Sequence, residues 1–192
     1  MDNFINIMDK KQKKEYCASV HEQIVSWTEN CDTKASIILA FIGVVATIVF
    51  SSDYLLGTIE LQVKNIITYW HNGEGYFSIL STLMFISLLG FISMIGVSSY
   101  FIISVLTPRL NGPRGSIIFF KGIAETGEED YISKVNHTSD EDLDIDKLTQ
   151  IYTCAKICDE KFSAYRKSIK YLWISLICLI VFVLTVILLN AF

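Results

Sequence analysis

The residues of this chain best suited to chemistry are basic side chains close to its apolar segments. Lys34 lies directly before the first apolar run, and Arg109 and Arg114 follow Pro108 and Pro113 in a turn-rich connector. Lysine and arginine bind phosphate well, and the planar guanidinium can do so through two parallel hydrogen bonds. The candidate residues for binding a phosphate-bearing ligand are therefore Lys34, Arg109, Arg114, Lys161 and Arg166. The alternative is that basic residues fix the topology and contact anionic lipid headgroups.

Residue patterns typical of catalysis are absent from the sequence. It contains no Gly-rich phosphate loop, no HExxH pair and no recognisable nucleophile–base pair. Cys154 and Cys158 lie four residues apart, but a zinc site would need two more converging ligands, and the three histidines are scattered. We expect packing thiols rather than a metal site, and neither an enzyme nor a bound cofactor.

Three long uncharged segments set the fold class. Residues 35–52, 75–106 and 171–192 contain no charged side chain, and a helix of about 20 such residues crosses a bilayer core. We expect an all-α membrane protein with transmembrane helices at 35–52, 77–106 and 171–192. These would separate an N-terminal helix (1–34), an outer loop (53–76) and an inner segment (107–170). The spans carry no acidic, basic or histidine residue, which argues against an ion pump or coupled transporter.

The basic residues predict the orientation. Of the 16 lysines and arginines, only Lys64 lies between the first two spans. By the positive-inside rule, the N-terminus and residues 107–170 lie in the cytoplasm and residues 53–76 outside.

Two predicted helices run into the membrane without a break. Before the first span, the apolar residues step by three and four: Cys17, Val20, Ile24, Trp27 and Cys31. The same spacing precedes the third span: Leu148, Ile151, Ala155, Cys158, Phe162, Tyr165, Ile169 and Leu172. Ser139 is a suitable N-cap for this second helix. We expect the two helices to pair in parallel as a cytoplasmic stalk. The alternative is that each stripe packs on some other surface, including a second copy of the chain.

Other segments are less specific. Residues 54–70 could lie in the outer interface or form a short hairpin, and the acidic segment 125–146 is typical of a solvated, mobile loop. The second span contains small residues that could permit close helix packing or could simply be tolerated in lipid: Ser87, Gly90, Ser93, Gly96, Ser98 and Ser99.

Several of these segments together resemble a known family. They are DTKASIILAFIGVVATIVFS at 32–51, LTPRL at 106–110, GSIIFFKGIA at 115–124, and the helix with Tyr152, Lys161 and Arg166 before the last span. In order and spacing, across roughly residues 20 to 185, the chain resembles the membrane-spanning effectors of bacterial Pycsar antiphage systems.

The resemblance implies a function. A partner pyrimidine cyclase would make cUMP or cCMP during infection, and this cyclic pyrimidine mononucleotide would activate the effector. The effector would then impair the bacterial inner membrane and cause abortive infection. The expected partners are the lipid bilayer, the cyclic nucleotide, the cyclase through its product, and further copies of the chain, with no nucleic acid.

Two other classes of function remain open from the residues alone. One is a structural or regulatory membrane subunit that docks a cytoplasmic protein without binding nucleotide. The other is a small channel gated by a different signal.

Overall fold

The computed structural model describes residues 9–72, 79–108 and 116–191, and these contain helices and no strand. The helices are α1 (Lys10–Phe50), α2 (Asp53–Asn72), α3 (Ile79–Leu106), α4 (Phe120–Glu125), α5 (Glu128–His137) and α6 (Asp140–Ala191). Among the described residues, α1, α3 and α6 are long and apolar enough to cross a membrane. The predicted all-α membrane fold with three spans is confirmed.

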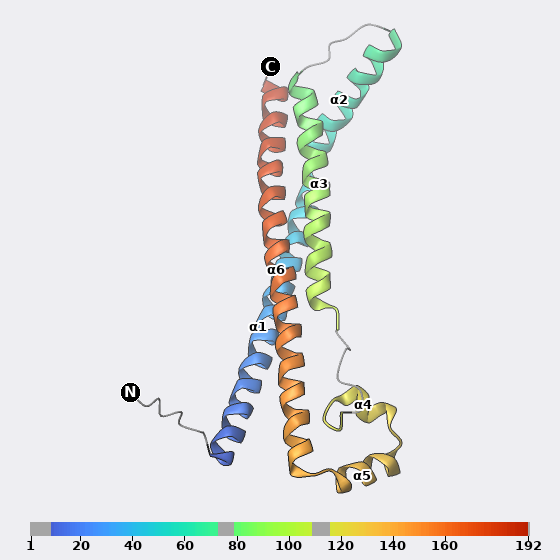
Figure 1. Ribbon diagram of the computed structural model, residues 1–192. Helices are drawn as coiled ribbons and strands as arrows, with labels where there is room; N and C mark the ends of the chain where they lie inside the picture. Colours follow the sequence, from blue (N-terminus) through green and yellow to red (C-terminus); the bar gives the residue numbers. More distant parts are fainter. Residues whose placement is uncertain (1–8, 73–78, 109–115, 192) are drawn as a thin grey trace, which may run out of the picture. The chain divides into compact units, whose positions relative to one another are not determined.

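The chain divides into two compact units. One, which we call the polar unit, comprises Met1–Asp32 and Thr107–Phe162, and the other, the apolar unit, comprises Thr33–Leu106 and Ser163–Phe192. The long helices α1 and α6 contribute residues to both units, and each is assigned as a single helix (Figure 1). The unbroken helices predicted from the sequence are therefore present.

The start of α6 is fixed by a hydrogen-bonded cap. Ser139 Oγ accepts a hydrogen bond from the Asp142 N–H at 3.1 Å, and its own hydroxyl donates to Asp142 Oδ2 at 2.6 Å. The first turn also holds acidic side chains, which the helix dipole favours at this end. This confirms Ser139 as the cap predicted from the sequence.

The acidic segment 125–146 differs from the mobile loop that was expected. Most of it is helical, with α5 at Glu128–His137 and α6 beginning at Asp140. The first turn of α5 contains three acidic residues and its last turn contains Lys134 and His137. This distribution complements the helix dipole, so the charges that suggested a loop stabilise a helix instead.

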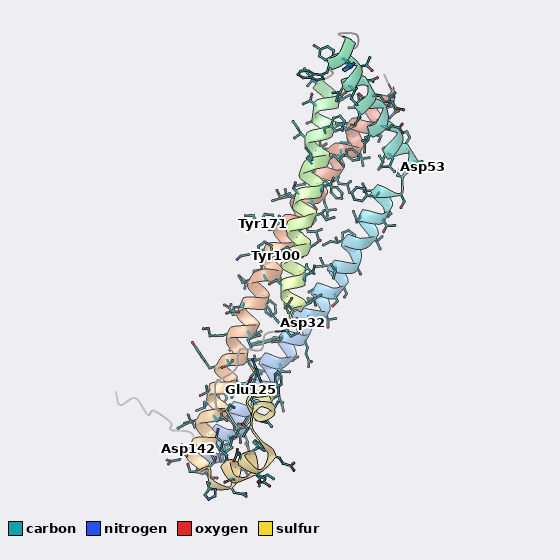
Figure 2. All side chains as sticks on the ribbon, turned by 90° about the vertical axis from the view of Figure 1, so that its right-hand side faces the viewer. Asp32, Asp53, Tyr100, Glu125, Asp142 and Tyr171 are labelled. Atoms are coloured by element: carbon teal, nitrogen blue, oxygen red, sulfur yellow. The ribbon has the colours of Figure 1, made fainter. Side chains whose placement is uncertain are left out.

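The core of the apolar unit lies between α3 and α6. Met84 of α3 packs with Phe182 and Val186 of α6, and all three side chains are fully buried. Farther along the same pair of helices, Phe101 stacks on Tyr171 with ring centroids 5.8 Å apart. Figure 2 labels Tyr171 and the neighbouring Tyr100 on adjacent stretches of the two helices.

Small residues of α3 contribute unevenly to this packing. Ser98 and Ser168 are both fully buried, and the hydroxyl of each donates to the backbone carbonyl of the other, at 3.0 and 2.9 Å. A Cβ added at Gly90 would lie 3.1 Å from the sulfur of Cys178, so the helices approach closely there. By contrast, the α3 positions 93 and 96 are exposed. Close approach explains only some of the small residues.

Helix α2 packs against the start of α3 and the end of α6. The Ser81 hydroxyl of α3 donates to Gln62 Oε1 at 2.7 Å, and Asn190 Nδ2 of α6 donates to Thr58 Oγ1 at 2.8 Å. Residues 53–72 therefore form a helix, and the hairpin considered from the sequence is wrong.

Candidate functional site in the polar unit

The first part of α1 and the first part of α6 lie side by side in the polar unit. Polar contacts between described residues join them in the same order along both helices, and they include Lys14 with Asp144, His21 with Cys154, and Asp32 with Lys161. The sequence separations of these pairs lie between 129 and 133 residues, so the two helices run parallel and nearly in register. This is the parallel pairing that the two apolar stripes predict.

The stripe of α1 that faces α6 differs in part from the predicted one. Ile24 and Cys31 are buried as expected, but Trp27 is 56% exposed. The neighbouring Thr28 is half-buried instead, and its hydroxyl donates to the Ile24 carbonyl at 2.8 Å. Val20 is half-buried, as is His21, so of these predicted positions only Trp27 is replaced, by Thr28.

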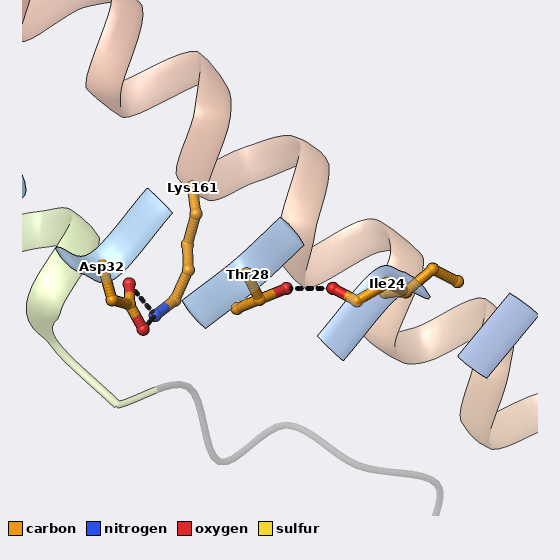
Figure 3. A network of polar contacts seen from close by, with 4 residues as sticks. All are labelled: Ile24, Thr28, Asp32 and Lys161. Carbon is orange, nitrogen blue, oxygen red and sulfur yellow. Dashed lines mark hydrogen bonds and ion pairs between the residues drawn. The ribbon is translucent and has the colours of Figure 1, made fainter. Parts of the chain in front are cut away.

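An ion pair joins α1 and α6 near the last residues that these helices contribute to the polar unit. Lys161 Nζ donates to both carboxylate oxygens of Asp32, at 2.6 and 2.7 Å (Figure 3). The Lys161 side chain is 9% exposed and that of Asp32 is 37% exposed, so the lysine is almost fully buried while the aspartate keeps partial contact with water. Burial of a lysine requires such a partner, because an unpaired ammonium in the interior is strongly unfavourable.

A second polar cluster lies farther toward the start of the helices. Cys154 Sγ is 3.9 Å from His21 Nε2 and accepts a weak hydrogen bond from Gln150 Nε2 at 3.7 Å. Burial raises the pKa of the Cys154 thiol above its ordinary value of 9.0, so the sulfur is held in its neutral form. No group of three or more potential metal ligands occurs among the described residues, and a packing role for this thiol stays a prediction.

The segment before α4 is attached to α6 by one carboxylate. Asp146 Oδ2 accepts hydrogen bonds from the Ser116 hydroxyl and the Ile117 N–H, both at 2.9 Å. Tyr131 of α5 donates its hydroxyl to the Ile117 carbonyl at 3.2 Å. Ile117 and Phe119 are buried as a result. Both residues thus belong to the core of the polar unit.

Gly122 lets α4 approach this segment. A Cβ at position 122 would lie 2.7 Å from the backbone carbonyl oxygen of Ser116, which is closer than real Cβ contacts allow. Serine and glycine therefore both have structural roles in GSIIFFKGIA, one in binding Asp146 and the other in packing.

The basic residues predicted to bind a ligand are distributed between the two units. Lys34 and Arg166 are exposed residues of the apolar unit, while Lys161 belongs to the polar unit and is paired with Asp32. Arg109 and Arg114 lie outside the described residues. Within the described ranges, no hydrogen bond or ion pair joins one of these residues to another. The roles of all five in ligand binding stay predictions.

The polar clusters of the polar unit were not identified from the sequence. Asp32 begins the segment DTKASIILAFIGVVATIVFS at 32–51, but a phosphate site requires basic side chains, and these criteria select Lys34 instead. His21 and Gln150 gave no signal, since each is a single polar residue in a helix with many others.

Comparison with known proteins identifies the family. The sequence model of the Pycsar effector protein domain, PycTM, matches residues 17–189. The Pycsar effector protein GmPycTM of Gulbenkiania mobilis is 30% identical over 185 residues, which cover 92% of this chain and 94% of the relative. No solved structure matches. With three helices long enough to span a membrane and a family match over most of its length, this chain belongs to the Pycsar effector family, the membrane effectors of an antiphage defence system.

Proposed function

We propose that this protein senses a cyclic pyrimidine mononucleotide, cUMP or cCMP, and responds by impairing the inner membrane of the bacterial cell. The observation that carries the proposal is that α1 and α6 each supply residues to both the polar and the apolar unit. A ligand that alters the pairing of these helices in the polar unit acts on the same two helices that enter the apolar unit.

The ligand must discriminate between two packings to have this effect. Binding shifts a conformational equilibrium only by the difference in affinity between its two states. The polar contacts that hold the resting pairing include the Asp32–Lys161 ion pair. An anion that enters the polar unit changes the electrostatic balance around these contacts. Binding of the nucleotide and the change in helix pairing are therefore thermodynamically coupled.

The spans suit disruption of the membrane better than selective transport. Residues 35–52, 77–106 and 171–192 carry no charged side chain, so they offer no ring of charge to select ions. We expect a weakly selective defect, formed by several copies of the chain. The cell dies with the phage, and this is abortive infection.

We place the polar unit in the cytoplasm. The support is the distribution of basic residues, of which only Lys64 lies between the first two spans. A cyclase product would be available on that side. Labelling of a single cysteine introduced at exposed position 11 or at exposed position 64, in a variant without native cysteines, tests the topology. A membrane-impermeant maleimide on intact spheroplasts should label position 64 only.

Dye leakage from vesicles tests the function directly. Purified protein is reconstituted into liposomes filled with a self-quenching dye, and cUMP, cCMP, cAMP or cGMP is added inside and outside. We expect leakage with cUMP or cCMP and none with the purine nucleotides or in protein-free vesicles. Binding without leakage would contradict membrane impairment. Failure to bind any cyclic nucleotide, together with co-purification of a stoichiometric protein, would favour the docking subunit instead.

A further inference from the structure

A cavity of about 780 Å³ lies in the polar unit beside the first turns of α1 and α6. Its volume is within the range of small-molecule sites, about 300–1,000 Å³. Helix α1 provides one wall, α6 provides the other, and Ile118 contributes from the connector. The residues that line it are Lys10, Lys13, Lys14, Cys17, Ala18, His21, Ile118, Glu141, Asp144, Ile145, Lys147, Leu148, Gln150 and Ile151.

The charged residues of the cavity favour an anion. Four lysines line it against two carboxylates. Within the described residues only one of the four, Lys14, has an ion pair, which it makes with Asp144 at 3.4 Å. The ammonium groups of Lys10, Lys13 and Lys147 remain for a ligand. Three lysines from two helices are well suited to a phosphate group with one negative charge.

The uncharged lining favours a flat, partly apolar group beside that phosphate. Ile118, Ile145, Leu148 and Ile151 supply aliphatic surface, and both Ile145 and Leu148 are substantially exposed at 61% and 43%. Aliphatic side chains left accessible beside a cluster of lysines match a nucleotide, which has an apolar ring face and an anionic group on one molecule.

One buried polar atom lacks a partner in this lining. Gln150 Oε1 is buried and has no hydrogen bond within the described residues, while its Nε2 is directed to Cys154. A buried carbonyl without a donor is uncommon and unfavourable, and it calls for an explanation. An N–H donor on a ligand would satisfy it, and both pyrimidine bases carry one, uracil at N3 and cytosine at its 4-amino group.

We infer that this cavity is the binding site for the cyclic pyrimidine mononucleotide, an inference that rests on the function proposed above. The phosphate contacts Lys10, Lys13 and Lys147, and the base lies on the aliphatic lining and donates to Gln150 Oε1. Because the lysines come from both α1 and α6, the bound nucleotide bridges the two helices. The site is distinct from the predicted set that includes Lys34 and Arg166, which lie in the apolar unit.

Calorimetry on the full-length protein in detergent tests the assignment, with cUMP, cCMP, cAMP and inorganic phosphate as separate titrants. The test variant is Lys13→Gln with Lys147→Gln, which removes one cavity lysine from each helix. The matched control is Lys11→Gln with Lys156→Gln, which removes one exposed lysine from each helix outside the cavity. We expect at least a tenfold rise in Kd for the test variant and less than a twofold change for the control. Lys13→Arg with Lys147→Arg should restore binding.

Gln150→Leu tests the base contact. It removes the amide while keeping a side chain of similar size, so we expect at least a fivefold loss of affinity for the pyrimidine nucleotide and no change toward inorganic phosphate.

The outcomes separate the two proposals. If the wild-type protein binds no cyclic pyrimidine nucleotide, the proposed function and the cavity assignment both fail. If it binds one and the cavity variants bind equally well, the function stands and the cavity assignment is overturned. Loss of binding in Lys34→Gln with Arg166→Gln, but not in the cavity variants, would place the site in the set predicted from the sequence.

Discussion

Lys161 Nζ lies 2.6 Å from Asp32 Oδ1 and 2.7 Å from Oδ2, which joins α6 to α1 through one ammonium shared by both carboxylate oxygens. The lysine is almost fully buried and the aspartate is partly exposed. Removing Asp32 and removing Lys161 should therefore have different effects on the charge that remains. A lone Asp32 can be solvated in place, whereas a lone Lys161 cannot.

We predict that Asp32→Asn destabilises the protein more than Lys161→Met does. The first variant leaves a buried ammonium without its counter-charge, and loss of a hydrogen bond to a charged group costs about 1.5–3 kcal/mol. The second removes the charge and keeps an unbranched apolar chain, so the cost should be below about 1 kcal/mol. Thermal unfolding in detergent measures both.

A second ion pair provides the control for this comparison. Lys64 and Glu60 of α2 also lie 2.6 Å apart, but both side chains are 68% exposed. The hydrogen bond and the charge of Lys64 lower the pKa of Glu60. Glu60→Gln should leave the melting temperature unchanged, because exposed pairs contribute little. An equal loss for Asp32→Asn and Glu60→Gln would contradict the role given to burial.

We predict that Gly122→Ala weakens the packing of α4 against the backbone at Ser116 and destabilises the protein. The added methyl group would lie 2.7 Å from the Ser116 carbonyl oxygen, so either α4 or the Ser116 backbone must move. Overpacking of this kind typically costs about 1–3 kcal/mol. Faster proteolysis within residues 116–125 and a lower melting temperature should result.

Gly127→Ala is the matched control for that substitution. Its Cβ would meet only Asp130 Oδ2 at 3.8 Å, an ordinary contact distance. It should match the wild type in both measurements. A similar drop in melting temperature in both variants would contradict the role of the close contact between Gly122 and Ser116.

We predict that a disulfide between positions 98 and 168 blocks leakage but not nucleotide binding. The two serine hydroxyls are 2.9 Å apart and buried, so Ser98→Cys with Ser168→Cys should form the bond on oxidation in a variant without native cysteines. In the proposed function leakage follows from repacking of the apolar unit, so it should stop in the oxidised protein and return on reduction.

Ser99→Cys with Ser168→Cys controls for the cysteines themselves. Ser99 donates to the Ile95 carbonyl of its own helix, so its side chain is not directed to Ser168. This pair should form little disulfide and leak normally. Full leakage from the oxidised 98–168 protein would show that α3 and α6 stay together during activation.

We predict that alkylation of Cys154 is slow at pH 8 and needs a higher pH than an unfolded cysteine does. Burial raises the pKa of this thiol, so the reactive thiolate is scarce in the folded protein. The same pKa shift determines how the stability of the protein changes with pH. Stability is undiminished below the ordinary value of 9.0 and falls as the pH rises toward the raised pKa, because only the unfolded state ionises readily. Peptide-resolved mass spectrometry with iodoacetamide measures the rates, with the protein unfolded in urea as reference.

The sequence was most informative where a long pattern repeats. Three uncharged segments predicted the spans, and the three-and-four spacing predicted that α1 and α6 pair. Single positions were harder. The spacing of apolar residues predicts Trp27 in the interface, yet Trp27 is exposed and Thr28 is half-buried. Burial of this threonine is tolerated because its hydroxyl donates to the Ile24 carbonyl. The exposed indole shows that an apolar side chain need not face the nearest helix.

Tertiary contacts were beyond such patterns. The acidic residues of 125–146 were interpreted as solvated, but Asp146 binds Ser116 and the Ile117 N–H across 30 residues of sequence. Likewise the role of Gly122 depends on the neighbouring carbonyl of Ser116. The cavity could not be predicted either, since its lysines and Gln150 come together only when α1 and α6 pair.

Helix α2 forms hydrogen bonds with the start of α3 and with the end of α6, which lie more than a hundred residues apart in the sequence. Thr58 holds Asn190 near the end of α6, and Gln62 holds Ser81 near the start of α3. Loss of α2 would therefore release α3 and α6 together at this end of the apolar unit.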